Sequence, residues 1–267
     1  MSWNPRRYLE FADHRLRPAM DLLARVIADA PHSVVDLGCG AGNVTRLLAQ
    51  RWPDADIAGI DNSAAMLERA RATMAGAARV RFEERDLASW TPAAPVDVVY
   101  SNAALHWLGG HATLFPRLVA ALAPGGTLAV QMPRNFDAPS HRAVAEVARS
   151  ERWRSRIGDL VREAPVAAPE QYLRWLAADA ASVDAWETIY LQRLSPRDDG
   201  EHPVVAFVSG TWLVPYFDRL EGDPAAREAF LADYRACIAR AFPLERDGTT
   251  LFPFRRLFVV ATRAAAA

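Results

Sequence analysis

Residues 34–43 read Val34-Val35-Asp36-Leu37-Gly38-Cys39-Gly40-Ala41-Gly42-Asn43. A short apolar run enters this segment, three glycines alternate through it, and apolar residues at helical spacing follow it. This order predicts a strand, a tight turn and a helix. Because glycine lacks a Cβ, glycine at every second position lets the backbone pass very close to a ligand. Asp36, on the strand two residues before the first glycine, favours a cationic or zwitterionic ligand over a pyrophosphate.

The spacing of the glycines distinguishes between two kinds of ligand site. The pattern is Gly-x-Gly-x-Gly, and Asn43 stands where the dinucleotide fingerprint needs its third glycine. A nucleotide-binding module or an NAD enzyme is therefore disfavoured. On this stretch alone, a plain glycine-rich turn in another doubly wound α/β protein remains the alternative.

Alternating strand and helix patterns continue to about residue 132. Apolar runs that are followed by helical spacing predict a parallel sheet covered by helices, which is an α/β fold. Beyond this point the pattern is mostly helical, with one strand-like run and a clear final strand. The further predicted strands are 56–60, 80–83, 96–101, 127–132, 183–194 and 256–262.

These patterns also predict the domain organisation. We expect a single domain over residues 1–267. Its parts are an N-terminal helical arm (1–33), core βα units (34–133), helical lid insertions (134–182 and 195–253) and a final strand (254–263).

Two acidic residues follow predicted strands at the sheet edge where ligands bind in open α/β folds. Asp61 ends the second strand, where a carboxylate can accept both hydroxyls of a ribose or only cap a turn. Asp86 follows the third strand and could accept from an adenine amino group, with Leu87 and Met66 flanking the ring. A solvated loop position is the alternative for Asp86.

His106 and Trp107 follow the fourth predicted strand and are candidates for the same edge. A lone histidine is equally well explained as a structural group with satisfied hydrogen bonds.

Composition excludes several other classes of protein. The net charge of −1 argues against a general nucleic-acid or membrane-surface binder. The two cysteines form no disulfide framework, and the six histidines show no metal-ligand spacing. There is no apolar leader and no run of about 18 apolar residues. We therefore expect a soluble, cytoplasmic protein with no metal.

Several segments carry a family resemblance: 3–9 with Phe11, Arg17 and Pro18, then 36–43, 59–63, 101–107, 122–128, 130–133 and 254–263. Together they resemble the trans-aconitate 2-methyltransferase family of class I S-adenosylmethionine (SAM) methyltransferases. The resemblance implies a Rossmann-like, mostly parallel seven-stranded sheet whose last strand is antiparallel, with helices on both faces. It also implies transfer of a methyl group from SAM to a carboxylate of trans-aconitate, giving a monomethyl ester and S-adenosylhomocysteine.

The resemblance and the strand-end positions give two sets of expected site residues. The reaction needs no general base, because a carboxylate is already ionised at neutral pH. We expect catalysis by positioning and water exclusion alone. The cofactor set is Asp36, Gly38, Gly40, Asn43, Asp61, Asn62, Met66, Asp86, Leu87, Asn102 and Trp107. The set for the polycarboxylate substrate is Tyr8, His106, Arg134, His141, Tyr190 and Arg256.

The sequence departs from the family pattern in the expected lid. Trp212 replaces a glycine, Val214 replaces an arginine, and Gln192 stands where a histidine is common. The loss of one arginine removes a potential carboxylate clamp, which Arg134 could restore from another direction. Another small-molecule carboxylate, or a less polar acceptor, is therefore the alternative substrate.

Overall fold

The computed structural model describes residues 16–162 and 164–265. The chain divides into two compact units, each described here by itself. Unit 1 comprises residues up to 133 together with 165–188 and those from 256 onward, and unit 2 comprises 134–164 and 189–255. Residues 165–188 thus group with the sheet. The interpretation of 134–182 and 195–253 as a lid stays a prediction.

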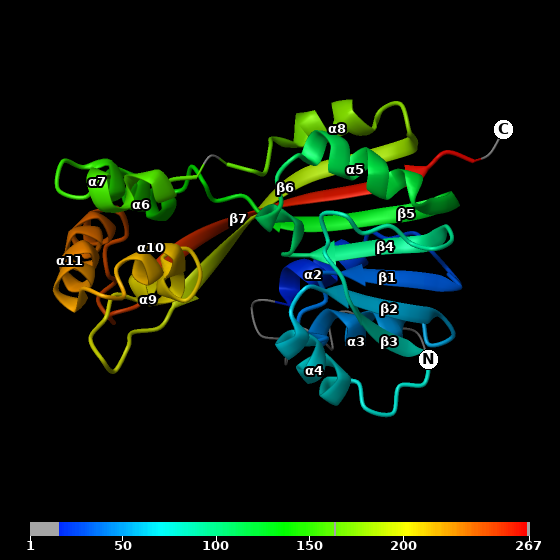
Figure 1. Ribbon diagram of the computed structural model, residues 1–267, viewed down its shortest axis with the longest axis horizontal. Coiled ribbons are helices and arrows are strands. Elements are labelled where there is room, and N and C mark those ends of the chain that lie inside the picture. The colour runs from blue at the N-terminus through cyan, green and yellow to red at the C-terminus, as the bar shows by residue number, and fades with distance from the viewer. Residues whose placement is uncertain (1–15, 163, 266–267) are drawn as a thin grey trace. The chain divides into compact units, whose positions relative to one another are not determined.

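Seven strands form a single sheet in the order β3-β2-β1-β4-β5-β7-β6 (Figure 1). The five strands that come first in the chain are parallel to one another, and β7 is antiparallel to β5. The predicted α/β fold with an antiparallel last strand is confirmed. The strands are β1 (Ser33–Leu37), β2 (Asp56–Asp61), β3 (Val80–Glu84), β4 (Val96–Asn102), β5 (Leu122–Pro133), β6 (Ala180–Leu194) and β7 (Thr250–Arg263).

In unit 1, helices cover the sheet, and most of them follow one of its parallel strands. The central strands β1 and β4 are buried along almost their whole length, as expected for a sheet covered on both faces. On one of these faces, the Tyr100 hydroxyl donates to the Ala19 carbonyl. The helices are α2 (Arg17–Leu23), α3 (Asn43–Arg51), α4 (Ala64–Thr73), η1 (Leu105–Trp107), α5 (His111–Ala120) and α8 (Pro169–Leu176).

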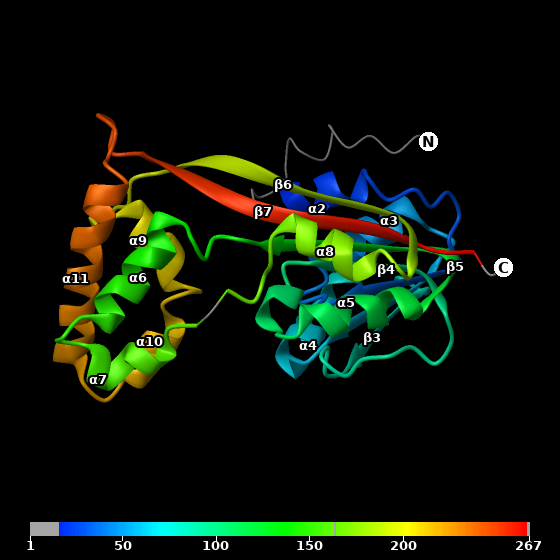
Figure 2. The same cartoon turned by 90° about the horizontal axis from the view of Figure 1, so that it is seen from above.

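Helix α8 packs beside α5 (Figures 1 and 2). Tyr172 of α8 is fully buried, and its hydroxyl lies 2.7 Å from Nδ1 of His111 in α5. This polar contact within an apolar interface fixes how the two helices align.

Local sequence signals explain where the first helices begin. Helix α3 follows Gly42, whose φ of +81° is a backbone conformation that favours glycine. Helix α4 begins after Ser63, whose hydroxyl accepts a hydrogen bond from the Met66 backbone N–H, as its N-cap position predicts.

Strand β5 begins at Leu122, five residues earlier than the sequence predicts. The turn signal Pro124-Gly125-Gly126 lies inside the strand, because Leu122 still pairs with Val96 of β4. The register then shifts between Val96 and Val98. Two residue steps along β4 face five along β5, so this irregularity accommodates three extra residues without ending the strand.

Unit 2 is a helical cluster with a core of its own, in which Trp153, Phe230, Tyr234 and Phe252 are buried. Helix α6 packs beside α11 (Figure 2). The helices are α6 (Pro139–Arg149), α7 (Arg154–Ile157), η2 (Gly158–Leu160), α9 (Pro203–Ser209), α10 (Val214–Arg219) and α11 (Pro224–Ala241).

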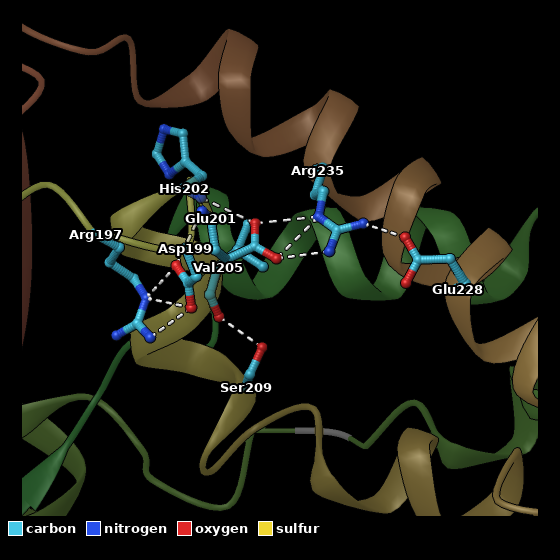
Figure 3. A network of polar contacts seen from close by, with 8 residues as sticks. All are labelled: Arg197, Asp199, Glu201, His202, Val205, Ser209, Glu228 and Arg235. Atoms are coloured by element: carbon cyan, nitrogen blue, oxygen red, sulfur yellow. Dashed lines mark hydrogen bonds and ion pairs between the residues drawn. The ribbon is translucent and has the colours of Figure 1, made fainter.

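An ion-pair network joins α11 to the segment that precedes α9 (Figure 3). The Arg235 guanidinium donates from Nε to Oε1 and from Nη2 to Oε2 of the Glu201 carboxylate, at 3.1 and 2.6 Å. Its Nη1 donates to Glu228 at 2.6 Å. The bidentate geometry makes this pair stronger than an ordinary surface ion pair.

Candidate functional site

The glycine turn between β1 and α3 lies against the turn that follows β4. A Cβ on Gly38 would meet the Ala104 Cβ at 2.1 Å, and the φ of Gly38 is +84°. Glycine is therefore required here by both close packing and backbone conformation. Gly40 differs, because a Cβ there would meet no described atom within 4 Å. One side of the turn is thus available for a ligand to approach the backbone.

Asp36 lies in β1 beneath this turn and is 1% exposed. The Thr45 hydroxyl of α3 donates to its Oδ2 at 2.6 Å. Its other oxygen, Oδ1, is buried and has no hydrogen-bond partner among the described residues. Burial and the Asp61 charge raise the pKa of Asp36 to about 7, against the lowering effect of the Thr45 hydrogen bond.

Asp61 ends β2 and closes the glycine turn. Its Oδ2 accepts from the Gly40 backbone N–H at 2.9 Å, and its Oδ1 accepts from the Ser63 N–H at 3.0 Å. The turn-capping role that the sequence leaves open is therefore present. The carboxylate is only partly buried, so the predicted ribose contact can coexist with the cap.

The predicted adenine residues differ in their surroundings. Asp86 is exposed, and its two oxygens accept from the Ala88 N–H and the Ser89 hydroxyl at 3.0 and 3.2 Å. Leu87 is buried, with Cδ1 3.5 Å from the position of a Cβ built on Gly38. Met66 is 40% exposed. The structure thus brings Leu87 to the glycine turn, and an adenine role for Asp86 stays a prediction.

Asn43 and Asn62 are both exposed, at the start of α3 and directly after β2 respectively.

A row of polar side chains crosses one face of the sheet. Asp36 in β1 pairs in register with Tyr100, and Asn102, two residues farther along β4, pairs with Gln131 in β5. Gln131 pairs with Phe258, which is two residues from Arg256 in β7. Since residues in register share a face and alternate residues of a strand do too, all four polar side chains lie on the same face.

The members of this polar row (Asp36, Asn102, Gln131 and Arg256) are connected at one end. Arg256 is 9% exposed, and its Nη1 donates to Oε1 of Gln131 at 3.4 Å. Asn102 Oδ1 and Gln131 Nε2 are buried atoms that bind no hydrogen-bond partner within residues 16–162 and 164–265.

His106 and Trp107 lie in η1, directly after β4. Burial, together with the nearby positive charge of Arg256, lowers the pKa of His106 to about 3. The imidazole is therefore neutral at physiological pH. Trp107 is 56% exposed, with its ring centroid 4.6 Å from that of His106.

Three of the predicted substrate residues belong to unit 2, and Tyr8 lies outside the described residues. His141 of α6 has its ring centroid 4.6 Å from that of Trp212, and burial lowers its pKa to about 4. Arg134 donates its backbone N–H to the Arg255 carbonyl, and Tyr190 is 7% exposed. Their roles in binding a substrate stay predictions.

Sequence reasoning did not assign two residues of this site, Thr45 and Gln131. A polar residue in an otherwise apolar strand such as Leu128–Met132 is a signal that could have singled out Gln131. Thr45 carries no comparable signal, because its bond to Asp36 depends on how α3 packs on β1.

The described residues contain neither a cluster of metal ligands nor a membrane-spanning helix. No group of three or more His, Cys, Asp or Glu side chains in them could hold a metal ion. No helix in the part of the chain that the structure describes has the length and apolar character to cross a membrane.

Comparison with known proteins identifies close relatives over the full length of the chain. A family profile described as "Methyltransferase domain" matches residues 34–126. A trans-aconitate 2-methyltransferase from Streptomyces coelicolor is 50% identical, over 98% of this chain and 87% of that protein. One from Azoarcus sp. is 46% identical, over 98% and 99%.

Among solved structures, the YcgJ protein from Bacillus subtilis superposes with a TM-score of 0.58 at 15% identity. The match covers 95% of this chain and all of that one, and at this identity it supports the fold alone.

Proposed function

Because the chain belongs to the trans-aconitate 2-methyltransferase family, we propose that it transfers a methyl group from SAM to one carboxylate of trans-aconitate. The product is a monomethyl ester. The single observation that best supports this reaction is the polar row, which carries Asp36 at one end and Arg256 at the other.

The glycine turn has the features that SAM requires. Asp36 offers a buried oxygen with no partner among the residues described, which suits a cationic or zwitterionic group. Gly40 leaves the backbone open on one side. Asp36, Asp61 and the turn would hold SAM, which supplies an electrophilic methyl group on a positively charged sulfur.

Arg256 provides the positive charge that an anionic acceptor needs, in a form that binds a carboxylate through two parallel hydrogen bonds. The neutral His106 adds no second charge beside it. Asn102 and Gln131, between the two charged ends, are uncharged amides. The residues of the row therefore bind, orient and exclude water, and none of them has to remove a proton.

An aromatic group in unit 2 favours a second candidate, an acceptor with an apolar portion. The Trp212 ring centroid lies 4.6 Å from that of His141 and 5.4 Å from that of Phe136. Such a cluster would contact a hydrocarbon group better than a carboxylate.

Incubating the purified protein with methyl-labelled SAM and a panel of acceptors distinguishes these candidates. A methyl ester releases its label when it is hydrolysed by base, so base-labile label measures ester formation. We expect such label with trans-aconitate, and much less with an apolar monocarboxylate of similar size. Base-labile product only with the apolar acid would support the second candidate. An absence of ester from trans-aconitate would contradict the first.

We also propose a cytoplasmic location, since Cys39 and Cys237 are both free thiols, as expected in a reducing compartment. Cell fractionation checks this proposal.

A further inference from the structure

Gln131 is the polar residue in the row whose burial is hardest to explain by structure alone. It lies near the end of β5 and is 0% exposed, as are Ala129, Val130 and Met132 around it. An apolar side chain would fit this environment without the cost of burying an amide.

Chemistry determines which way the Gln131 amide faces. A guanidinium group only donates hydrogen bonds, so the side of the amide that faces Arg256 must be the oxygen. The amide nitrogen is then directed elsewhere. It is buried and has no acceptor in the described parts of the chain. A buried donor with no acceptor is costly, so such a group in a folded protein calls for an explanation.

Arg256 and Gln131 together present two kinds of donor next to each other. The guanidinium contributes a full positive charge, and the amide contributes N–H groups that stay neutral at every pH. The Gln131 oxygen also orients the guanidinium through the 3.4 Å contact. A carboxylate has two oxygens and accepts only, so it matches this pair.

We propose that Gln131 and Arg256 form a clamp for a carboxylate of the acceptor other than the one that is methylated, which makes Gln131 a specificity-determining residue. This inference rests on the proposed function. A carboxylate whose oxygens both accept hydrogen bonds from the clamp has its negative charge stabilised and is a poor nucleophile. The clamped carboxylate therefore anchors the acceptor, and a second carboxylate of the same molecule accepts the methyl group. A polycarboxylate is consequently preferred to a monocarboxylate.

Two substitutions that preserve the shape of the side chain test the clamp. Gln131→Met removes the amide, and Gln131→Glu keeps its shape but places a carboxylate beside Arg256. Gln171→Glu, on a partly exposed position of α8, is the matched control. For each protein we would measure the dissociation constant of trans-aconitate in the presence of S-adenosylhomocysteine, the dissociation constant of S-adenosylhomocysteine alone, and KM and kcat.

We expect Gln131→Met to weaken trans-aconitate binding about 10- to 100-fold, the range for a lost hydrogen bond to a charged group. Gln131→Glu should weaken it more, because its carboxylate pairs with Arg256 and repels the acceptor. S-adenosylhomocysteine affinity should stay within about twofold of wild type, because Gln131 is not part of the glycine turn. The preference for trans-aconitate over a monocarboxylate with one double bond should fall by the same factor as the affinity.

Wild-type affinity and KM for trans-aconitate in both Gln131 variants would overturn the clamp and leave the proposed function standing. A parallel loss of affinity for S-adenosylhomocysteine and for trans-aconitate would also overturn it, because the role would then be structural. If Gln131→Met does not fold, Gln131→Asn repeats the measurement with a shortened amide, for which the same loss of trans-aconitate affinity is expected. The wild-type ester assay tests the proposed function separately.

Discussion

Asp36→Asn is expected to stabilise the unliganded protein at pH 8 while it weakens SAM binding. Burial raises the pKa of Asp36 from 3.8 to about 7. This difference corresponds to ~4 kcal/mol in favour of the protonated form. Because the folded pKa is the higher one, Asp36 contributes stability that is fully present below pH 3.8 and is lost as pH rises towards 7. Asparagine keeps the shape and carries no such penalty.

The same titration predicts how the affinity for SAM varies with pH. Only the ionised carboxylate attracts the cationic ligand, so the apparent affinity follows the ionised fraction of Asp36. For a pKa of about 7, that fraction is about 0.9 at pH 8 and about 0.1 at pH 6, which predicts roughly tenfold weaker binding at pH 6. Below pH 7, binding should also release close to one proton.

Titration calorimetry in two buffers with different ionisation enthalpies measures both the affinity and the released proton. Asp36→Asn is the control, because any pH dependence of affinity that remains in this variant comes from titration of groups other than Asp36, including those of the ligand. Thr45→Val removes a hydrogen bond that lowers the Asp36 pKa, so it should shift the affinity profile to higher pH, and Thr45→Ser should restore it. A wild-type affinity that is flat from pH 6 to pH 8, with no proton released, would refute this reasoning.

Two further predictions concern stability and are measured by urea unfolding. Gly38→Ala places a methyl group 2.1 Å from the Ala104 Cβ at a φ of +84°, and should lower the free energy of unfolding by ~3 kcal/mol or more. Gly76 has a similar φ, but a Cβ there would meet no atom within 4 Å, so Gly76→Ala should lower it by only ~1–2 kcal/mol. Equal losses would show that backbone conformation alone explains both. Arg235→Gln should lose ~1–2 kcal/mol, less at high salt, whereas Arg197→Gln at an exposed local pair should leave the free energy of unfolding unchanged within error. A salt-independent loss at Arg235 would indicate packing instead.

Local signals in the sequence were enough to predict the elements around the glycine turn. The glycine spacing determines the β1–α3 turn, and Ser63 determines the start of α4, because each depends on residues a few positions apart. The predicted start of β5 is wrong because Pro124-Gly125-Gly126 indicates a turn when the sequence is read alone. Only the pairing of Leu122 with Val96 shows that these residues form an irregularity inside the strand.

The polar row illustrates why part of the site could not be predicted in the same way. Asp36, Asn102 and Arg256 were each predicted as site residues, from position and resemblance. Their common face, and the role of Gln131, follow from the pairing of β4, β5 and β7, which brings together residues more than 100 positions apart. Periodicity within one strand carries no information about that register.

The order of charges along the row suits a reaction in which charge disappears. A sulfonium cation and a carboxylate anion combine to give a neutral thioether and a neutral ester, so the transition state is less charged than the reactants. Fixed charges beside the reacting atoms would stabilise the reactants more than the transition state and slow the reaction. In this protein the two ionisable residues of the row, Asp36 and Arg256, lie at its opposite ends, and the two residues between them are uncharged amides.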